Sequence, residues 1–286
     1  MLDPTHGDRT GHPSRTSSDL APRGSALITG ASAGIGAVYA ARLAQRGHDL
    51  ILVARNAERL NAVATRVAEE SGRSVRVIVA DLNDRADLAR VAQALRTDAS
   101  ISILVNNAGT GATTTLLESD IEKLGRMIDL NITALVRLTH AAAPAFAKRG
   151  GGAIINVGSV VGIAPDAFET GGVYGGTKAF VLAFSLSLHK ELAQHNIRIQ
   201  AVLPGATATD FWDQAGTPVD RLPGEIVMTA EDLVDAAIAG LDLGELVTIP
   251  SLPDTADWEA YEAARQRLIP HLSLKAPAER YGIVTA

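Results

Sequence analysis

The sequence contains no cysteine in its 286 residues. This absence excludes disulfides, zinc sites with thiolate ligands, iron–sulfur clusters and cysteine nucleophiles, and it leaves the redox compartment open. No run approaches the roughly 20 consecutive apolar residues of a membrane-spanning helix. A surplus of basic residues is also missing, because the formal net charge is −6. That charge argues against nucleic acid or a membrane surface as the main partner.

The composition is otherwise ordinary for a folded protein, with 47% hydrophobic and 20% charged residues. Only residues 1–23 have almost no apolar side chains to bury, so we predict a flexible N-terminal tail there. The remainder, residues 24–286, is predicted to form a single domain. The tail lacks the apolar stretch of a secretory signal, and its three arginines are balanced by three aspartates, unlike a transit peptide. We therefore expect a cytoplasmic protein.

Short apolar runs alternate with longer segments of helical spacing as far as about residue 250. The runs predicted as strands are 26–29, 50–54, 75–80, 101–105, 153–157, 197–203 and 246–249. Ser119 with Glu122, and Thr229 with Asp232, fit capping patterns at helix starts. Strands that are apolar on both faces and alternate with helices indicate βαβ units. The sequence thus predicts an α/β fold of the doubly wound, Rossmann type, with seven parallel strands and helices on both faces.

A glycine-rich stretch, Thr29-Gly30-Ala31-Ser32-Ala33-Gly34-Ile35-Gly36, follows the first predicted strand. Glycines at a strand-to-helix turn let the backbone turn tightly and let a pyrophosphate approach the positive end of the next helix. The spacing differs from the commoner Gly-x-Gly-x-x-Gly fingerprint, and a glycine-rich turn can also exist without a ligand. The residues predicted to contact a cofactor here are Gly30, Ser32, Ala33, Gly34, Ile35 and Gly36.

The form Thr-Gly-x-x-x-Gly-x-Gly resembles the cofactor motif of the short-chain dehydrogenase/reductase family. Further matching elements follow in the family's order: Asp81-Leu82, Asn106-Asn107-Ala108-Gly109, Asn131, Ser159, Tyr174-x-x-x-Lys178 and Pro204-Gly205. The resemblance spans about residues 24–249. It implies an oxidoreductase that transfers hydride between a nicotinamide cofactor and a carbonyl compound or secondary alcohol.

The resemblance also implies a role for each matching residue. Ser159 would orient and polarise the substrate carbonyl, and Tyr174 would transfer the proton. Lys178 would lower the pKa of Tyr174 and hold the cofactor ribose, and Asn131 would position a water for proton relay. The cofactor contacts implied beyond the glycine motif are Asp81, Leu82, Asn107, Ala108, Gly109, Tyr174, Lys178, Pro204, Gly205, Thr207 and Thr209.

The spacing of Tyr174 and Lys178 has a physical basis of its own, because residues four apart share one helix face. Free tyrosine has a pKa near 10, which is too high for efficient acid–base work at neutral pH. An ammonium about 4 Å from the phenolate contributes ~4 kcal/mol at an effective dielectric of 20, or roughly three pKa units before desolvation. The alternative, a half-buried tyrosine beside a solvated lysine, is disfavoured by Ser159 on the preceding strand end. No histidine pair has zinc-ligand spacing, so no metal is expected.

The residue at the end of the second predicted strand indicates which nicotinamide cofactor is used. An acidic residue there would hydrogen-bond the adenosine ribose of NAD and disfavour a 2′-phosphate. Here Ala54 takes that position and Arg55 follows, and a guanidinium can pair with phosphate. We predict NADP(H) and the reduction of a ketone or a 3-oxoacyl compound. An NAD-dependent alcohol dehydrogenase, or a nucleotide-binding protein without catalysis, remains an alternative.

Three further expectations concern the substrate and the assembly. A substrate loop is predicted at about residues 205–228, where Phe211 and Trp212 either favour a hydrophobic carbonyl substrate or only pack on the domain. The C-terminal extension, residues 253–286, is expected to pack on the domain or on a neighbouring subunit. Two long helical segments carry more apolar residues than a one-sided helix requires, which predicts a homo-oligomer, a tetramer rather than a dimer.

Overall fold

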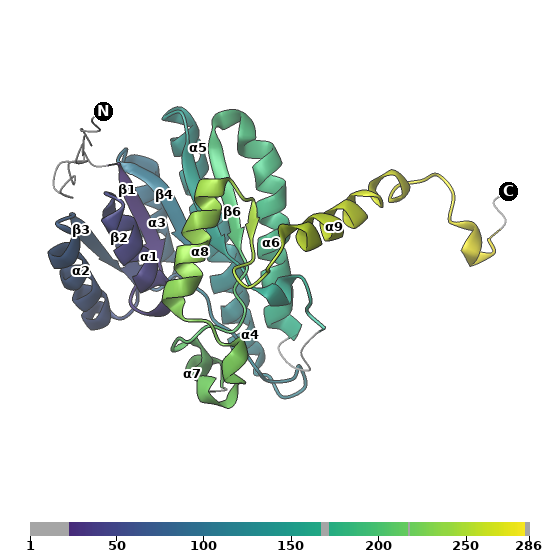
Figure 1. Ribbon diagram of the computed structural model, residues 1–286, viewed down its shortest axis with the longest axis horizontal. Coiled ribbons are helices and arrows are strands. Elements are labelled where there is room, and N and C mark those ends of the chain that lie inside the picture. Colours follow the sequence, from purple (N-terminus) through teal and green to yellow (C-terminus); the bar gives the residue numbers. More distant parts are fainter. Residues whose placement is uncertain (1–22, 167–171, 217, 284–286) are drawn as a thin grey trace, which may run out of the picture. The chain divides into compact units, whose positions relative to one another are not determined.

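The computed structural model describes residues 23–166, 172–216 and 218–283 (Figure 1). The predicted tail therefore lies almost wholly outside the described residues. The chain divides into two compact units, Met1–Pro250 and Ser251–Ala286. Whether residues 24–286 behave as one domain stays a prediction. No described helix has both the length and the apolar character needed to cross a membrane.

The first unit is built on one seven-stranded sheet of order β3-β2-β1-β4-β5-β6-β7, with every pairing parallel. Its strands are β1 (Ser25–Thr29), β2 (Asp49–Ala54), β3 (Val75–Val79), β4 (Ile101–Asn106), β5 (Gly152–Val157), β6 (Ile197–Val202) and β7 (Val247–Thr248). Each coincides with a run predicted from the sequence, so the doubly wound α/β fold is confirmed. The strand order reverses between β1 and β4, which is the switch point where such folds bind ligands.

Helices cover both faces of this sheet (Figure 1). They are α1 (Gly34–Gln45), α2 (Ala57–Ser71), α3 (Arg85–Thr97), α4 (Ile121–Ile128), a π-helical turn (Asp129–Ala134), α5 (Leu135–Lys148), α6 (Gly172–Leu192), α7 (Phe211–Ala215) and α8 (Ala230–Leu243). Short 3₁₀ turns lie at Val160–Gly162, Ala193–His195, Val219–Arg221 and Gly224–Ile226.

The hydrophobic core is split by the sheet into two clusters. Ile28 of β1 packs with residues of α1, α2 and α8, whereas its neighbour Leu27 packs with residues of α3, α5 and α6. Successive side chains of a strand point to opposite faces, so a continuous apolar strand supplies both clusters. This explains why the strands appear in the sequence as unbroken apolar runs rather than as alternating ones.

The helix starts show one correct and one wrong cap prediction. Thr229 caps α8 as predicted, because its Oγ1 accepts a hydrogen bond from the Asp232 amide at 3.0 Å. The predicted cap at Ser119 is wrong. Asp120 caps α4 instead, accepting from the Glu122 amide at 2.9 Å, while the Ser119 hydroxyl donates to the Thr115 carbonyl. The Asp120 carboxylate lies one residue closer to the helix than Ser119 and is the Ncap side chain of α4, and a helix start needs only one such side chain.

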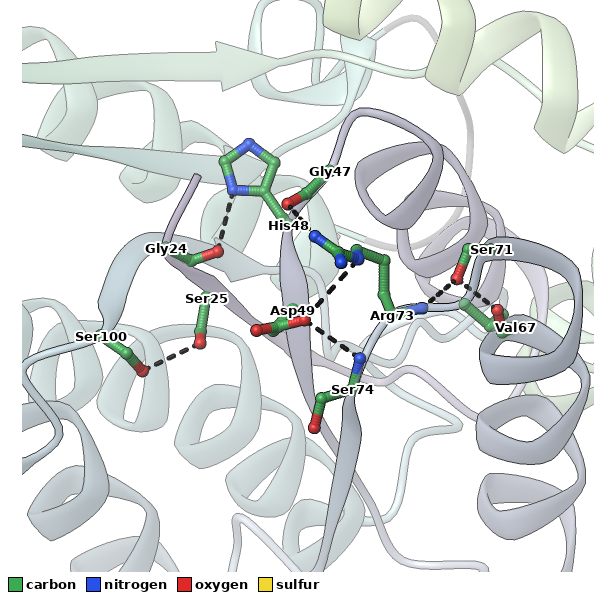
Figure 2. Close-up of polar contacts among 10 residues, drawn as sticks. All are labelled: Gly24, Ser25, Gly47, His48, Asp49, Val67, Ser71, Arg73, Ser74 and Ser100. Carbon is green, nitrogen blue, oxygen red and sulfur yellow. Dashed lines mark hydrogen bonds and ion pairs between the residues drawn. The ribbon is translucent and has the colours of Figure 1, made fainter. Parts of the chain in front are cut away.

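Polar contacts tie the strands together at the amino edge of the sheet, away from the glycine motif (Figure 2). Asp49 at the start of β2 accepts a hydrogen bond from the Ser74 amide at 3.0 Å and lies 3.9 Å from the Arg73 guanidinium. Ser25 at the start of β1 and Ser100 before β4 join through their hydroxyls at 2.9 Å. These contacts join the start of β2 to the start of β3, and the start of β1 to the start of β4, at the edge of the sheet opposite the glycine motif.

The second unit contains α9 (Thr255–Gln266) and 3₁₀ turns at Ile269–His271 and Glu279–Tyr281. None of its described residues is buried, and large apolar side chains such as Tyr261 and Leu272 are 46% and 71% exposed. The predicted packing of residues 253–286 on the domain or a neighbouring subunit stays a prediction. The predicted homo-oligomer also stays a prediction. On α6, the side chains of Phe180 and Phe184 are half-buried, and their ring centres stack 5.5 Å apart.

One core residue gives a stability test. Tyr39 of α1 is completely buried, and its hydroxyl has no hydrogen-bond partner among the described residues. A hydroxyl that loses water on folding without gaining a partner costs stability. Tyr39→Phe should therefore raise the free energy of unfolding by about 1 kcal/mol, measured by urea denaturation. Tyr261→Phe, at an exposed ring, is the matched control and should change nothing. A destabilised Tyr39→Phe protein would contradict the argument.

Candidate active site

A cavity of about 550 Å³ opens at the carboxyl ends of the strands. Its wall is formed by the residues that end or follow the strands, from Gly30 after β1 to Pro204 after β6. Parallel strands deliver their carboxyl ends to one edge, so motifs far apart in sequence meet there.

Every predicted site residue except Gly36 and Asn131 lines the cavity. Those on the wall are Gly30, Ser32, Ala33, Gly34, Ile35, Arg55, Asp81, Leu82, Asn107, Ala108, Gly109, Ser159, Tyr174, Lys178, Pro204, Gly205, Thr207 and Thr209. The structure thus brings the motifs together; the role of each residue stays a prediction.

The glycine turn packs closely against the start of α1 and against Asn107. A Cβ at Gly36 would collide with the Gly30 carbonyl and lie 2.6 Å from Asn107 Nδ2. Asn107 closes the turn, since its Nδ2 donates to the Thr29 carbonyl at 2.9 Å. The Ncap of α1, Ala33, offers no side-chain cap, and the first turn has no acidic residue. The free amides of such a helix start fit a pyrophosphate.

Arg55 and Asp81 lie at the end of the cavity formed by β2 and β3. Arg55 is exposed, and no described residue forms a hydrogen bond or ion pair with its side chain. The Asp81 carboxylate accepts from the Asn83 amide at 3.0 Å, which fixes the turn after β3. A guanidinium available on this wall fits a cofactor phosphate, whereas a carboxylate at Ala54 would repel one.

The sequence analysis missed Arg59, which also lines this end of the cavity. Arg59 lies in the first turn of α2, where Asn56 accepts a hydrogen bond from its amide. Its guanidinium pairs with the Asp210 carboxylate at the start of α7. The available signal was spacing, because Arg59 follows Arg55 by four residues. Nothing in the sequence indicated its partner.

At the other end of the cavity lie Ser159, Tyr174 and Lys178. Ser159 follows β5, and its hydroxyl is held 3.3 Å from the Pro204 carbonyl. Tyr174 and Lys178 lie on one face of α6, as the spacing predicts. The Lys178 amine donates to the Val157 carbonyl at 2.9 Å and lies 5.7 Å from the centre of the Tyr174 ring.

Burial controls the titration of both residues of α6. Burial raises the pKa of Tyr174 to about 12, and the Ser159 hydroxyl acts in the opposite direction. Burial lowers the pKa of Lys178 to about 8. The Lys178 amine donates its hydrogen bond to the Val157 carbonyl, and the lowering of the Tyr174 pKa by Lys178 stays a prediction. At neutral pH the structure holds a protonated phenol beside an ammonium.

Asn131 lies in the π-helical turn between α4 and α5 and is 2% exposed. Its Oδ1 accepts from the Thr110 amide at 3.0 Å, and its Nδ2 donates to the Thr110 carbonyl at 2.9 Å. A second donation reaches the Thr177 hydroxyl at 3.0 Å. Single π turns are frequent at functional sites, but the predicted water-holding role of Asn131 stays a prediction.

One aromatic side chain of the predicted substrate loop, Phe211, lies beside Tyr174, and a second, Trp212, packs on Phe211. The ring of Phe211 lies 5.7 Å from that of Tyr174 and 5.8 Å from that of Trp212. Trp212 is held by its indole N–H, which donates to the Thr207 carbonyl at 2.8 Å. A Cβ at Gly111 would lie 2.5 Å from the Phe211 ring, so glycine is needed opposite it. Within the described ranges, no cluster of acidic and histidine side chains could hold a metal ion.

The chain belongs to the short-chain dehydrogenase/reductase family, since the family model described as "short chain dehydrogenase" matches residues 25–219. It is therefore an oxidoreductase of the class that acts on CH–OH and C=O groups.

Among curated proteins, it is 34% identical to an NADP-dependent 3-hydroxy acid dehydrogenase of Salmonella typhi, over 73% of this chain and 86% of that one.

Two solved structures are similar over 91% of this chain. One is a short-chain dehydrogenase from Sphingobium yanoikuyae in complex with NADPH, 50% identical, with a TM-score of 0.87 and all of that chain covered. The other is a bulky-bulky ketone specific alcohol dehydrogenase from Comamonas testosteroni, 45% identical, with a TM-score of 0.84 and 99% of that chain covered.

The buried amine predicts a stability change of defined sign. The pKa of Lys178 is about 8 in the folded protein, against 10.5 for a lysine exposed to water. The folded protein thus carries a costly ammonium below pH 8, and stability rises with pH from about 8 to 10.5, because the unfolded chain holds the proton longer. Lys178→Met should stabilise the cofactor-free protein by about 2 kcal/mol at pH 7, after the lost hydrogen bond is subtracted.

Urea unfolding of both proteins at pH 7 and pH 10 measures this difference. The advantage of Lys178→Met should shrink above pH 8. Lys190→Met, at an exposed residue of the same helix, is the control and should give a difference independent of pH. A Lys178→Met protein that is less stable at pH 7 would rule out a costly buried charge.

Proposed function

We propose that this protein is an NADP(H)-dependent carbonyl reductase, which transfers hydride between the nicotinamide and the carbonyl carbon of a ketone. One observation carries the proposal: a single cavity joins an uncapped helix start, the available guanidinium of Arg55, and Ser159 with Tyr174 and Lys178. Anion-binding groups and proton-transfer groups thus occupy opposite ends of one site.

The residues present fit the cofactor along the length of the cavity. The amides at the start of α1 would hold the pyrophosphate, and Arg55 would hold the 2′-phosphate. Asp81 and Leu82 would border the adenine. The turn that begins at Pro204 would border the nicotinamide, with Thr207 and Thr209 nearby. The bound cofactor supplies the hydride.

The proton chemistry follows from burial. Because burial raises the pKa of Tyr174 to about 12, the phenol stays protonated at neutral pH and can donate to a carbonyl oxygen. The Ser159 hydroxyl would donate a second hydrogen bond to that oxygen. The Lys178 ammonium, present below about pH 8, would stabilise the phenolate left after transfer. A protonated acid in the resting state supports the reductive direction.

The names of the relatives support NADP(H) over NAD(H). The Sphingobium structure contains NADPH, and the Salmonella relative is named as NADP-dependent. The missing acid at Ala54 and the exposed Arg55 agree with that choice. An NAD-dependent enzyme remains the alternative, because the family includes enzymes that use NAD.

The charge distribution supports an uncharged ketone as substrate. The described wall near Tyr174 is apolar or aromatic, with Val160, Val161, Pro165, Gly111, Ala112, Phe211, Trp212, Leu222 and Ile226. A free hydroxy acid or 3-oxo acid carries a carboxylate close to its reacting carbon, and this anion needs a cation to replace its water. On the described wall, Arg55 lies at the other end, the Arg59 guanidinium is paired with the Asp210 carboxylate, and the Lys178 amine donates to the Val157 carbonyl. The description of the Comamonas neighbour as specific for bulky-bulky ketones supports the same choice.

The first test is the reduction of propiophenone by NADPH, with acetoacetate as the charged comparison. Tyr174→Phe keeps the ring and removes the proton, so kcat should fall by about 10² to 10⁴-fold while NADPH still binds, measured by fluorescence titration. Tyr261→Phe is the control and should keep wild-type turnover.

Near wild-type turnover by Tyr174→Phe would remove that residue as the acid. A wild-type protein that binds NADPH but reduces no ketone would favour the nucleotide-binding alternative, and a preference for acetoacetate would overturn the uncharged substrate.

The second test is cofactor choice. Arg55→Ala should raise KM for NADPH by about 10- to 150-fold and leave NADH nearly unchanged, because a charge-assisted phosphate contact is lost. Adding Ala54→Asp should reverse the preference, since the carboxylate binds free ribose hydroxyls and repels the phosphate. Arg66→Ala, on α2 and outside the cavity wall, is the control. Equal weakening of both cofactors by Arg55→Ala would refute the phosphate contact.

A further inference from the structure

Thr177 lies inside the Tyr174-x-x-x-Lys178 motif, at a position to which the sequence analysis gave no role. Its side chain is 2% exposed. Its Oγ1 donates to the Tyr174 carbonyl at 2.8 Å and accepts from Asn131 Nδ2 at 3.0 Å. One hydroxyl therefore joins the turn of α6 that carries the tyrosine to the π-helical turn that carries Asn131.

The direction of each hydrogen bond is fixed by the partners. The backbone of Thr110 offers an N–H to one end of the Asn131 amide and a carbonyl to the other, so that amide has only one orientation. Its second Nδ2 hydrogen needs an acceptor, and the Thr177 hydroxyl supplies it. The hydroxyl hydrogen is directed to the Tyr174 carbonyl, which is the usual helix back-bond of threonine.

The Asn131 amide also lies close to the surroundings of Lys178. A Cβ built on Gly109 would be 3.2 Å from Asn131 Oδ1 and 3.6 Å from the Lys178 amine. The Asn131 amide and the Lys178 amine thus both lie close to Gly109, which has no side chain to separate them. A shift of Asn131 would change the polar groups around both motif residues of α6.

We infer that Thr177 is a positioning residue, whose hydroxyl holds the π-helical turn of Asn131 in register with Tyr174 and Lys178. The inference rests on the proposed reductase function. Any side chain without an acceptor here leaves a buried amide N–H unpaired, so Asn131 must shift or its turn must open. Small displacements of groups near the reacting atoms reduce kcat more than they reduce the binding of substrate or cofactor.

The chain supplies a closely matched control in Thr139 of α5. Thr139 is also 2% exposed, and its Oγ1 also accepts from an asparagine Nδ2, that of Asn106, at 3.0 Å. Thr139 does not line the cavity and contacts neither motif residue of α6. Thr177→Val and Thr139→Val therefore remove the same kind of buried hydroxyl, one within the site and one outside it.

The experiment compares four proteins in propiophenone reduction by NADPH: wild type, Thr177→Val, Thr177→Ser and Thr139→Val. Thr177→Val should lower kcat by about 10- to 100-fold, with the Kd for NADPH unchanged and a loss of Tm similar to that of Thr139→Val. Thr177→Ser keeps the hydroxyl and should recover most of kcat. Equal kcat for the two valine variants, or a serine variant as slow as Thr177→Val, would overturn the inference.

Two further measurements separate this inference from the proposed function. Amide hydrogen exchange in residues 129–134 should speed up in Thr177→Val and stay unchanged in Thr139→Val, whether or not the protein turns over a ketone. An unchanged rate in both variants would overturn the inference. If Thr177 acts through Asn131, then Asn131→Ala combined with Thr177→Val should lose no more kcat than Asn131→Ala alone, whereas multiplied losses would overturn it. Thr177→Ala replaces Thr177→Val if the latter does not fold.

Discussion

The burial of one amine constrains the catalytic end of the cavity. The Lys178 side chain is 6% exposed, and it has one protein acceptor, the Val157 carbonyl at the end of β5. An ammonium removed from water is costly unless its hydrogens are satisfied. This carbonyl is within reach because the end of β5 lies close to α6. The 3₁₀ turn that follows β5 also approaches α6, since a Cβ on Gly162 would lie 2.7 Å from the Lys178 carbonyl oxygen. The end of β5 and α6 must therefore stay close together if the amine is to keep its acceptor.

A second set of buried hydrogen bonds fixes the strand ends from which the site is built. Asn106 and Asn156 are register partners at the ends of β4 and β5, and their side chains join at 2.9 Å. Asn106 also reaches Thr139 on α5, and Asn156 reaches Ser185 on α6. Buried polar groups that are hydrogen-bonded to one another allow few alternative arrangements. In this set, Asn106 Oδ1 is the buried atom that has no hydrogen-bond partner among the described residues. The bond from Asn156 to Ser185 and the bond from Asn131 to Thr177 attach α6 to the carboxyl edge where the catalytic side chains lie. The bond from Asn106 to Thr139 joins β4 to α5, which carries none of those side chains.

The sequence predicted those parts of the structure that depend on local pattern. The strands were predictable because a strand buried on both faces is an unbroken apolar run, and the glycine turn was predictable because only glycine tolerates the close contacts of Gly36. The contact of Asn131 with Thr177 spans 46 residues and that of Arg59 with Asp210 spans 151, so no periodicity indicates either. Helical spacing predicts the shared face of Tyr174 and Lys178 but not the Val157 carbonyl that accepts from the amine, and the predicted effect of Lys178 on the pKa of Tyr174 stays a prediction.

The charge distribution in the cavity follows from the topology of the sheet. Residues after β2 and β3 lie on one side of the switch point, and they contribute Arg55 and Asp81 to the wall. Residues after β5 and β6 lie on the other side, where the charged wall residues are Lys178 and Asp210. The Lys178 amine donates to the Val157 carbonyl, and the Asp210 carboxylate pairs with Arg59 of α2, so this ion pair joins the two sides of the cavity. A ligand that spans the switch point therefore meets the available guanidinium of Arg55 at one end and apolar and aromatic side chains at the other.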